Sequence, residues 1–445
     1  MDAQALAAVK FTPAGVNAKT TSVQDELTSR ILARGDVEEA FRLTLENGLS
    51  KYSAAALHMR AMLRMRKGDM DAAEEMIDRS LRIEPTAFAW KMAGDCSFLK
   101  SQFDRAEHFY RKAIAMDPTS PEAVHDLAVA ITSQGRVEES LVGFRKAIEL
   151  DPRPDFKHHL SIMALLAGHD EEGWELMKYR LEVPGVTGTF PSPEKYWEGQ
   201  DLTGKVITVR TEQGWGDGIM FASYLPWLLK RAKKVYVFCQ RPLLTWFKHY
   251  YPECIPWPHD APPRLDFDYH VNIMCLPRLV KDGYARPAKR VRSGKGVGFC
   301  WYGSPTHKAD HLRTVPVERF APLAEALGEK LYCLGYGRFD QQPEFTKYIV
   351  ENSRDWLETS KIVEKRIGLI ITVDTAIAHL GGFLGIETWL LLPKVPDFRW
   401  GLTGETTPWY ESVKIYRQEQ VMNWDPVFER VKQDLIARKE FACKQ

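Results

Sequence analysis

A phrase that recurs every 33 to 34 residues constrains the first part of this 445-residue chain more than any other feature. Pro85, Pro118 and Pro152 close the similar phrases SLRIEP, AIAMDP and AIELDP. Small residues recur in register ahead of them at Ala61, Gly94 and Ala128, and again at Ala73, Ala106 and Ser140. Trp90, Tyr110 and Phe144 supply bulky positions. Because small residues let two helices approach and proline ends a helix, the pattern predicts paired helices from about residue 21 to 180.

This pattern resembles the tetratricopeptide repeat, a helix-turn-helix unit of about 34 residues. Three repeats match well, a weaker one precedes them around Gly35 and Ala40, and another follows around Gly168 and Trp174. Such arrays usually present a concave surface to a partner. The resemblance therefore implies a protein partner or self-association, and a purely structural scaffold is the alternative.

Composition excludes several classes of protein. The formal net charge of +1 gives no bulk attraction to nucleic acid or to an acidic membrane. The seven cysteines are odd in number and none has CxxC spacing, which argues against a disulfide framework and a zinc site. The apolar runs are shorter than the roughly 18–20 residues that a membrane span needs, and no signal peptide is apparent. We therefore expect a cytoplasmic protein without a transmembrane segment.

An α/β region follows a linker at Val183–Pro193 that is rich in proline and glycine. Lys205–Arg210 is predicted to be a strand, Ile219–Arg231 a helix and Lys234–Cys239 a second strand. Between the first strand and the helix lies the glycine-rich segment EQGWGDG, where the backbone can approach a ligand and Asp217 can face a cleft. The spacing is not GxGxxG, so no dinucleotide fingerprint is predicted.

A second α/β unit is predicted in the C-terminal part. Gly296–Tyr302 and Lys330–Leu334 have the composition of strands, and the polar segment GSPTHKADHLRTVP follows the first of them. The stretch from Leu369 to Pro393 then predicts a strand, a helix that Gly385 can close, and a strand at Thr388–Leu392.

The corner at Asp374, Thr375 and Ala376 follows a buried strand and opens this helix. Free N–H groups at a helix start attract anions, so the corner is a candidate diphosphate site. The alternative is that Asp374 only caps the helix. From the residues we expect a helical domain at 1–185 and two Rossmann-like α/β domains at 186–290 and 291–445, with a cleft between the α/β domains.

Four phrases resemble the catalytic part of bacterial tetratricopeptide-repeat glycosyltransferases, which are related to the heptosyltransferases of GT-B fold. They are WEGQDLTGKVITVRTEQGWGDGIMFASYLP, WYGSPTHKADHLRTVP, VDTAIAHLGGFLG and PDFRWGLTGETTPWYESVKIYRQ, in the expected order behind the repeats. The resemblance covers roughly residues 20–435, and it implies a last helix around Pro426–Arg438 that crosses back to the first α/β domain. It implies a helical array followed by a GT-B enzyme that moves a sugar from a nucleotide-sugar donor, without another cofactor, to an acceptor held by the first α/β domain.

The resemblance also implies site residues. Asp217 falls on the family's general-base position, Arg313 on its basic residue, and Asp374, Thr375 and His379 on its donor motif. Glu212 is a second candidate base. The full set of candidate donor or diphosphate contacts is Gly303, His307, Lys308, Arg313, Asp374, Thr375, Ala376 and His379. The candidate substrate contacts are Gln213, Trp215, Gly216, Asp397, Arg399 and Trp400.

Some positions depart from the family pattern, including Ser304, Ala309, His311, Met220 and Ser223. No cluster of residues has metal-ligand spacing, and arginine with a helix start can neutralise a diphosphate without an ion, so we expect a metal-independent enzyme. The resemblance to the heptosyltransferases implies that the enzyme is inverting. The acceptor stays open between a protein, a glycan, a lipid-linked sugar and a modified nucleobase. A non-catalytic adaptor with a vestigial glycosyltransferase fold is the main alternative.

Overall fold

The computed structural model describes residues 42, 53–188, 192–261, 266–289, 294–305, 310–335, 343–348 and 355–443, with backbone alone for 439–443. The chain forms two compact units, residues 1–160 and residues 161–445. The weak repeat expected around Gly35 and Ala40 lies outside the described residues.

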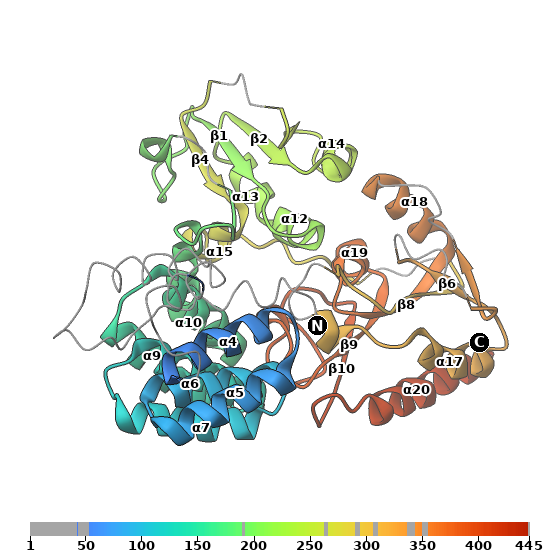
Figure 1. Ribbon diagram of the computed structural model, residues 1–445. Helices are drawn as coiled ribbons and strands as arrows, with labels where there is room; N and C mark the ends of the chain where they lie inside the picture. The colour runs from blue at the N-terminus through green and yellow to red at the C-terminus, as the bar shows by residue number, and fades with distance from the viewer. Residues whose placement is uncertain are drawn as a thin grey trace. The chain divides into compact units, whose positions relative to one another are not determined.

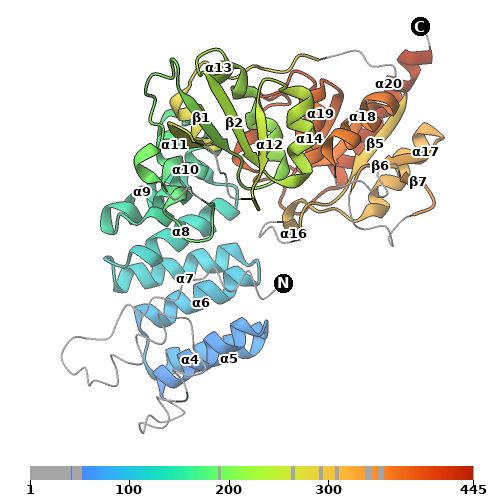
Figure 2. The same ribbon diagram turned by 90° about the horizontal axis from the view of Figure 1, so that it is seen from above.

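The first unit is built from paired helices that follow one another along the chain (Figures 1 and 2). The pairs are α4 (Ala54–Arg66) with α5 (Met70–Ile83), α6 (Ala87–Leu99) with α7 (Phe103–Met116), and α8 (Pro121–Ser133) with α9 (Val137–Leu150). Next come α10 (Pro154–Ala167), which contains the boundary between the units, and α11 (Asp170–Leu176). The predicted repeats around Pro85, Pro118 and Pro152 are confirmed as helical hairpins.

The first helix of each pair begins at a hydroxyl residue that repeats in register. Ser53, Thr86 and Ser120 are the N-caps, and each side-chain oxygen accepts a hydrogen bond from the N–H three residues later, at 3.1–3.3 Å. Such a cap satisfies one of the free donors at a helix start. The repeat is therefore encoded in its helix starts as well as in its prolines.

Small residues allow the two helices of a pair to touch. A Cβ placed on Gly94 would lie 2.4 Å from the ring of Tyr110, and one on Gly143 would lie 2.9 Å from the Cβ of Ala128. Tyr110 is buried, and its hydroxyl donates a 2.8 Å hydrogen bond to Asp95. The ring of Tyr110 is thus held against Gly94 and has little freedom to retreat.

A buried ionic network joins neighbouring helix pairs of this unit. The ammonium of Lys91 on α6 lies 3.1 Å from Asp95 and 2.7 Å from Asp126 on α8. Asp126 is also 3.0 Å from Nδ1 of His125. Although burial acts to lower the pKa of Lys91, the two carboxylates raise it above its ordinary value. The charged lysine therefore connects the second pair to the third.

The second unit contains two separate parallel sheets (Figure 1). The first sheet has the order β3-β2-β1-β4, and all its pairs are parallel. Its strands are β1 (Val206–Arg210), β2 (Lys234–Cys239), β3 (Ile255–Pro258) and β4 (Tyr269–Asn272). The helices and turns along it are η1 (Met177–Leu181), η2 (Pro193–Lys195), α12 (Trp215–Phe221), η3 (Ala222–Tyr224), α13 (Leu225–Leu229), η4 (Arg241–Leu243), α14 (Leu244–Tyr250), η5 (Ile273–Cys275) and α15 (Leu276–Leu279).

The second sheet has the order β10-β9-β8-β5-β6-β7 and is also parallel throughout. Its strands are β5 (Gly296–Cys300), β6 (Leu331–Cys333), β7 (Thr346–Tyr348), β8 (Ile367–Val373), β9 (Glu387–Leu392) and β10 (Val413–Arg417). Its helices are α16 (Asp310–Arg313), η6 (Val317–Phe320), α17 (Ala321–Leu327), α18 (Trp356–Arg366), α19 (Ala376–Leu384), η8 (Phe398–Trp400) and α20 (Asp425–Cys443). The domain boundaries expected at residues 185 and 290 remain predictions.

The strand-helix-strand unit predicted from Leu369 to Pro393 is confirmed as β8, α19 and β9. Every residue of β8 except Gly368 is buried, as its apolar composition predicts. Gly385 ends α19 with a φ of +70°, in the left-handed region that glycine adopts without a steric penalty. Helix α19 therefore starts at the carboxyl end of β8, which is one edge of the second sheet.

Two details of the predicted helices are wrong. The helix expected over Ile219–Arg231 begins earlier, at Trp215, and breaks into α12, η3 and α13, where Pro226 lies in the first turn of α13. Proline has no N–H to continue a helix but fits its first turn. The short α12 leaves the carboxylate of Asp217 in its first turn.

The last helix, expected around Pro426–Arg438 and with a return to the first α/β half, packs on the second sheet instead. Val427, Phe428, Val431 and Leu435 of α20 belong to the hydrophobic core that contains β5 and β8. The carboxylate of Asp434 also contacts Lys414 at 2.6 Å. The burial of this apolar face fixes α20 where it is.

Six cysteines among the described residues are free thiols, and all six are buried. No helix in the described part of the chain combines the length and apolarity that a membrane crossing requires.

The contact between Gly94 and Tyr110 gives a first prediction. We expect Gly94→Ala to lower the free energy of unfolding of the repeat unit by about 1–3 kcal/mol, the usual cost of an added methyl group in a packed core. In a Tyr110→Ala background the same change should be neutral or stabilising by up to about 1 kcal/mol, because alanine favours helix. Urea unfolding of the four proteins measures both values. Equal effects in the two backgrounds would show that the ring does not limit the space.

Candidate functional site

A largely buried group of ionisable residues lies where the two sheets of the second unit meet. We call it the Arg399 cluster and define it as Asp217, Asp374, His379, Asp397 and Arg399. Asp217 lies on α12, which follows β1, and the other four follow β8 or β9. Because the carboxyl ends of parallel strands share one edge of a sheet, each sheet directs its part of the cluster to that edge. The cluster joins residues that are far apart in the sequence.

Asp217 accepts two contacts that fix both of its carboxylate oxygens. The backbone N–H of Gly214 donates to Oδ2 at 2.8 Å, and the guanidinium of Arg399 contacts Oδ1. Burial raises the pKa of Asp217 above its ordinary value, while Arg399 and the N–H of Gly214 act in the opposite direction. Asp217 therefore caps the start of α12 and also takes part in an ion pair.

Arg399 bridges two carboxylates. Its Nη1 lies 2.6 Å from Oδ1 of Asp397, and its Nη2 contacts Asp217. Asp397 also caps η8, because its Oδ1 accepts from the N–H of Arg399 at 3.1 Å. Burial acts to raise the pKa of Asp397, but Arg399 holds it below its ordinary value. The sequence placed Asp397, Arg399 and Trp400 together, and it did not predict their contact with Asp217.

Asp374 is buried, and it does not cap α19. The N-cap is Thr375, whose hydroxyl accepts from the N–H of Ile377 at 3.2 Å. The capping alternative for Asp374 is therefore wrong, because the helix starts one residue later than that role requires. Burial, with the charge of Asp397 as the second cause, raises the pKa of Asp374 to about 6. Its carboxyl group thus titrates near neutral pH.

His379 lies on the first turns of α19, inside the cluster. Its Nδ1 is 3.1 Å from the hydroxyl of Tyr410, and its ring stacks on Trp400 with centroids 5.1 Å apart. Burial and the nearby charge of Arg399 lower the pKa of His379 to about 3. The imidazole is therefore neutral at physiological pH. Tyr410 was not a candidate from the sequence, since a single tyrosine in a polar loop carries no local signal.

The close approach of α12 and α19 depends on Gly216. A Cβ on this residue would lie 2.7 Å from the ring of His379 and 3.1 Å from the Cα of Ala376. Glycine is needed here because the start of one helix is in contact with the start of the other. Gly216 and Ala376, both predicted as site residues, therefore lie side by side.

Arg313 and Gly303 lie close together after β5, where Arg313 supplies a second positive charge. The guanidinium of Arg313 is 3.0 Å from Asp310, and a Cβ on Gly303 would lie 2.3 Å from Nη2 of Arg313. The charge of Arg313 also lowers the pKa of Asp374, against the effect of burial, which places it within electrostatic range of the Arg399 cluster. His307 and Lys308 lie outside the described residues.

Glu212 is held in a different buried pair. Its carboxylate contacts the fully buried guanidinium of Arg180, and Oε1 also accepts from the N–H of Met274 at 3.2 Å. The remaining Arg180 donors reach the carbonyl of Met177 and the sulfur of Cys275. These contacts hold η1 against the first sheet and argue against Glu212 as a base, because its oxygens are already engaged away from solvent. The sequence offered no signal for Arg180, which precedes the linker.

Gln213 and Trp215 border the cluster without a contact to Arg399 among those observed. Gln213 has a φ of +58°, which is rare for a residue with a side chain and costs of order 1 kcal/mol. Its amide donates to the carbonyl of Val186 at 3.0 Å. Trp215 meets Trp356 edge to face with centroids 5.7 Å apart. The loop after β1 is therefore strained and packed.

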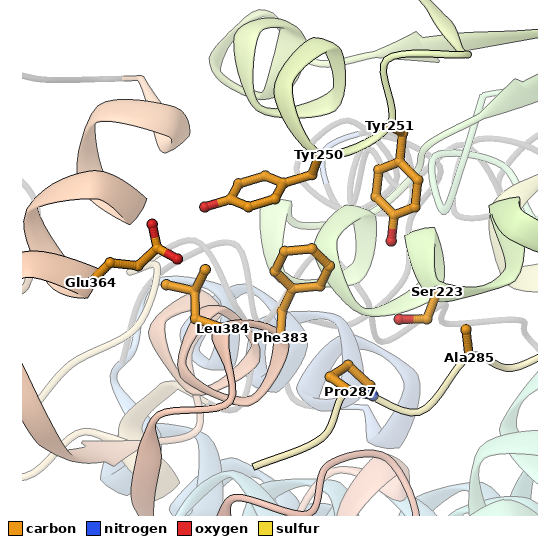
Figure 3. A pocket seen from close by; sticks show the side chains of 8 residues that line it. All are labelled: Ser223, Tyr250, Tyr251, Ala285, Pro287, Glu364, Phe383 and Leu384. Carbon is orange, nitrogen blue, oxygen red and sulfur yellow. The ribbon is translucent and has the colours of Figure 1, made fainter. Parts of the chain in front are cut away.

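A cavity of about 170 Å³ lies at the opposite end of α19 (Figure 3). Its lining comprises Ser223, Tyr250, Tyr251, Ala285, Pro287, Glu364, Phe383 and Leu384. Phe383 lies between the two tyrosine rings in Figure 3, and the carboxylate of Glu364 lies on the side of Tyr250. None of the residues predicted for the site lines this cavity. Among the described residues no group of three or more His, Cys, Asp or Glu side chains is placed to hold a metal ion.

Comparison with known proteins identifies the repeats. A family model for the tetratricopeptide repeat matches residues 54–86, which are α4 and α5. Protein FlbA of Caulobacter vibrioides is 24% identical over 388 residues, which cover 75% of this chain and 64% of FlbA. Cytochrome c-type biogenesis protein CycH of Rhizobium meliloti is 29% identical over 133 residues, covering 28% of this chain and 35% of CycH. The chain thus spans less than two thirds of either relative.

A solved structure of MamA from Desulfovibrio magneticus RS-1 has a TM-score of 0.28 and 21% identity, and covers 36% of this chain and 90% of MamA. That TM-score is too low to support a conclusion. A tetratricopeptide-like helical array, followed by an α/β region with parallel sheets, is therefore what the chain contains. Neither relative's name describes sugar transfer.

Loss of the Glu212 carboxylate should be costly to the fold. We expect Glu212→Ala to lower the free energy of unfolding by about 3–5 kcal/mol, because it leaves the charge of Arg180 buried without its partner. Glu198→Ala is the control, since that carboxylate is half exposed in its pair with Arg278 and should cost less than about 1 kcal/mol. Denaturant titration measures both. A Glu212→Ala protein as stable as the parent would refute the structural role.

The raised pKa of Asp374 makes stability depend on pH. The unfolded carboxyl titrates near 3.8 and the folded one near 6, so the folded chain binds the extra proton between these values. Stability from this group therefore falls as pH rises through that window. We expect Asp374→Asn to melt at a higher temperature than the parent at pH 7.5, with no gain near pH 4. A parent that is the more stable of the two at pH 7.5 would mean that the ionised Asp374 is stabilising.

Proposed function

We propose that this protein is a metal-independent glycosyltransferase of GT-B type that transfers a sugar from a nucleotide donor to an acceptor hydroxyl. One observation carries the proposal: Asp217, which follows β1, and the first turn of α19, which follows β8, meet in one buried charged cluster. Such an arrangement combines a candidate base with a helix start that can bind an anion. The first sheet would hold the acceptor and the second the donor.

Asp217 is the candidate general base. Sugar transfer requires a base that removes the proton of the acceptor hydroxyl as the new sugar bond forms. Direct attack of the acceptor oxygen, with the diphosphate leaving, would invert the anomeric centre of the sugar. Its place in the loop of Gly214 and Gly216 supports this role, because glycine lets a substrate approach the backbone closely. Glu212 is not retained as the alternative base, since its side chain is only 1% exposed beside Arg180, against 13% for Asp217.

The diphosphate of the donor would bind at the start of α19. Helix α19 has nine residues, enough for a developed dipole, and it begins at the edge where the cluster lies. Arg313 would add a charge-assisted contact. Three carboxylates surround Arg399, so the donor would bind best when Asp374 carries a proton, which its pKa of about 6 permits.

A second candidate function is that of a protein-binding adaptor whose α/β region no longer catalyses transfer. The tetratricopeptide repeat at residues 54–86 favours it, because such arrays commonly bind partners. The contact between Asp217 and Arg399 also fits it, since a paired carboxylate needs no substrate. The two functions differ in whether nucleotide sugars bind and turn over.

A panel of nucleotide sugars separates the two functions. UDP-, GDP-, ADP-, CMP- and dTDP-linked sugars would be tested for a rise in melting temperature, because a ligand that binds only the folded chain stabilises it. The enzyme predicts a rise with at least one donor and slow hydrolysis of it. The adaptor predicts no rise with any of the five.

With that donor, Asp217→Asn should lower transfer about 10²–10⁴-fold, the usual contribution of a positioned base. Donor affinity should barely change, because the donor binds at the second sheet. The fold should persist, since an asparagine oxygen can still accept from the N–H of Gly214. Asp260→Asn is the control, because Asp260 makes an exposed pair with Arg241. Near-normal transfer by Asp217→Asn would remove Asp217 from the mechanism.

A further inference from the structure

The nitrogens of the Arg399 guanidinium differ in whether they have a hydrogen-bond partner. Its guanidinium is buried, with 10% of the side chain exposed, and it contacts Asp217 and Asp397 through the two terminal nitrogens. Its Nε–H is also buried, and within the described residues it donates no hydrogen bond. Leaving a buried donor unpaired costs about 1–3 kcal/mol. The geometry therefore gives both carboxylate oxygens of Asp217 a hydrogen-bond donor, but it leaves the Nε–H of Arg399 without an acceptor.

Aromatic side chains prevent Arg399 from turning away. Its Cζ lies 4.3 Å from the ring centroid of Phe398 and 5.9 Å from that of Phe221. The indole of Trp409 donates to the carbonyl of Arg399 at 2.7 Å. Trp174 of α11 meets Phe221, Phe398 and Trp409 edge to face. The guanidinium is thus packed beside the rings of Phe398 and Phe221, and Trp174 of α11 supports those rings from behind.

We propose that Arg399 is a positioning residue for Asp217, which keeps that carboxylate ionised and fixes the direction in which its oxygens face an acceptor. The inference rests on the proposed function, in which Asp217 is the base. Arg399 acts on Oδ1 and the N–H of Gly214 acts on Oδ2, so the two contacts leave one orientation of the carboxylate. Arg399 itself touches no substrate in this role.

The charged residues around Asp217 and Arg399 determine the effect of removing Arg399. Asp217 lies near Arg399, Asp397 and Glu212, and Arg399 is in turn influenced by Asp374 as well as its two partners. Without Arg399, Asp217 would remain buried near Asp397 and Glu212 and lose the cation that offsets their charge. A close opposite charge lowers a carboxyl pKa by about 1–3 units, so its loss should raise the pKa of Asp217 by a similar amount.

The test compares Arg399→Met and Arg399→Lys with the parent. Because a base must be ionised to act, the acid limb of kcat/KM should move up by about 1–3 pH units in Arg399→Met. Arg399→Lys should recover part of this shift, since lysine restores the charge without the two-pronged contact. Arg241→Met is the matched control, because it removes an arginine from an exposed pair and should leave the limb in place. A uniform loss of rate with an unmoved limb would overturn the inference.

A second measurement does not need activity. The carboxyl carbons of the aspartates can be labelled with ¹³C and titrated by NMR, and the Asp217 signal is the one that Asp217→Asn removes. We expect its midpoint to rise in Arg399→Met and partly return in Arg399→Lys. An unchanged midpoint in the folded Arg399→Met protein would overturn the inference even if transfer is observed. A raised midpoint in a protein that transfers no sugar would support the role of Arg399 and refute the proposed function.

Discussion

The site of the second unit depends on a buried guanidinium shared by carboxylates of two sheets. Removing ions from water costs several kcal/mol for each, and close pairing recovers that cost only when the geometry is good. Arg399 meets Asp217 and Asp397 in this way, while Gly216 lets α12 touch α19. A side chain at Gly216 would separate the helices and lengthen the contact. The ion pair between Asp217 and Arg399 therefore depends on the close packing of α12 against α19.

The same buried electrostatics determine the chemistry that the cluster can perform. Burial raises the pKa of Asp374 to about 6 and lowers that of His379 to about 3, so Asp374 can be protonated near neutral pH whereas His379 stays a neutral imidazole. Groups with separated titration behaviour, close together at a sheet edge, are typical of functional sites. The buried ionic network of the repeat unit has a different role, because Lys91 pairs with Asp95 of its own helix and Asp126 of the next pair and so joins helices.

Local patterns in the sequence were sufficient for much of the fold. The apolar run before Asp374, the helix spacing after it and Gly385 predicted β8 and α19, since these features act within a few residues. Long-range contacts were not predictable. Asp217 and Arg399 are 182 residues apart, and no local pattern reveals that a carboxylate will meet that arginine. Likewise, the resemblance implied a last helix, but the sheet that α20 covers is decided by the packing of Val427 and Val431.

A structure of the full chain with its best nucleotide sugar would test the central claim most directly. We predict that the diphosphate contacts the N–H groups at the start of α19 and the guanidinium of Arg313, with the sugar directed toward Asp217. We also predict that Arg399 remains on Asp217 in that complex. A nucleotide bound away from β8 and α19, or an Asp217 carboxylate that remains remote from the sugar, would contradict a sugar-transfer site at the Arg399 cluster.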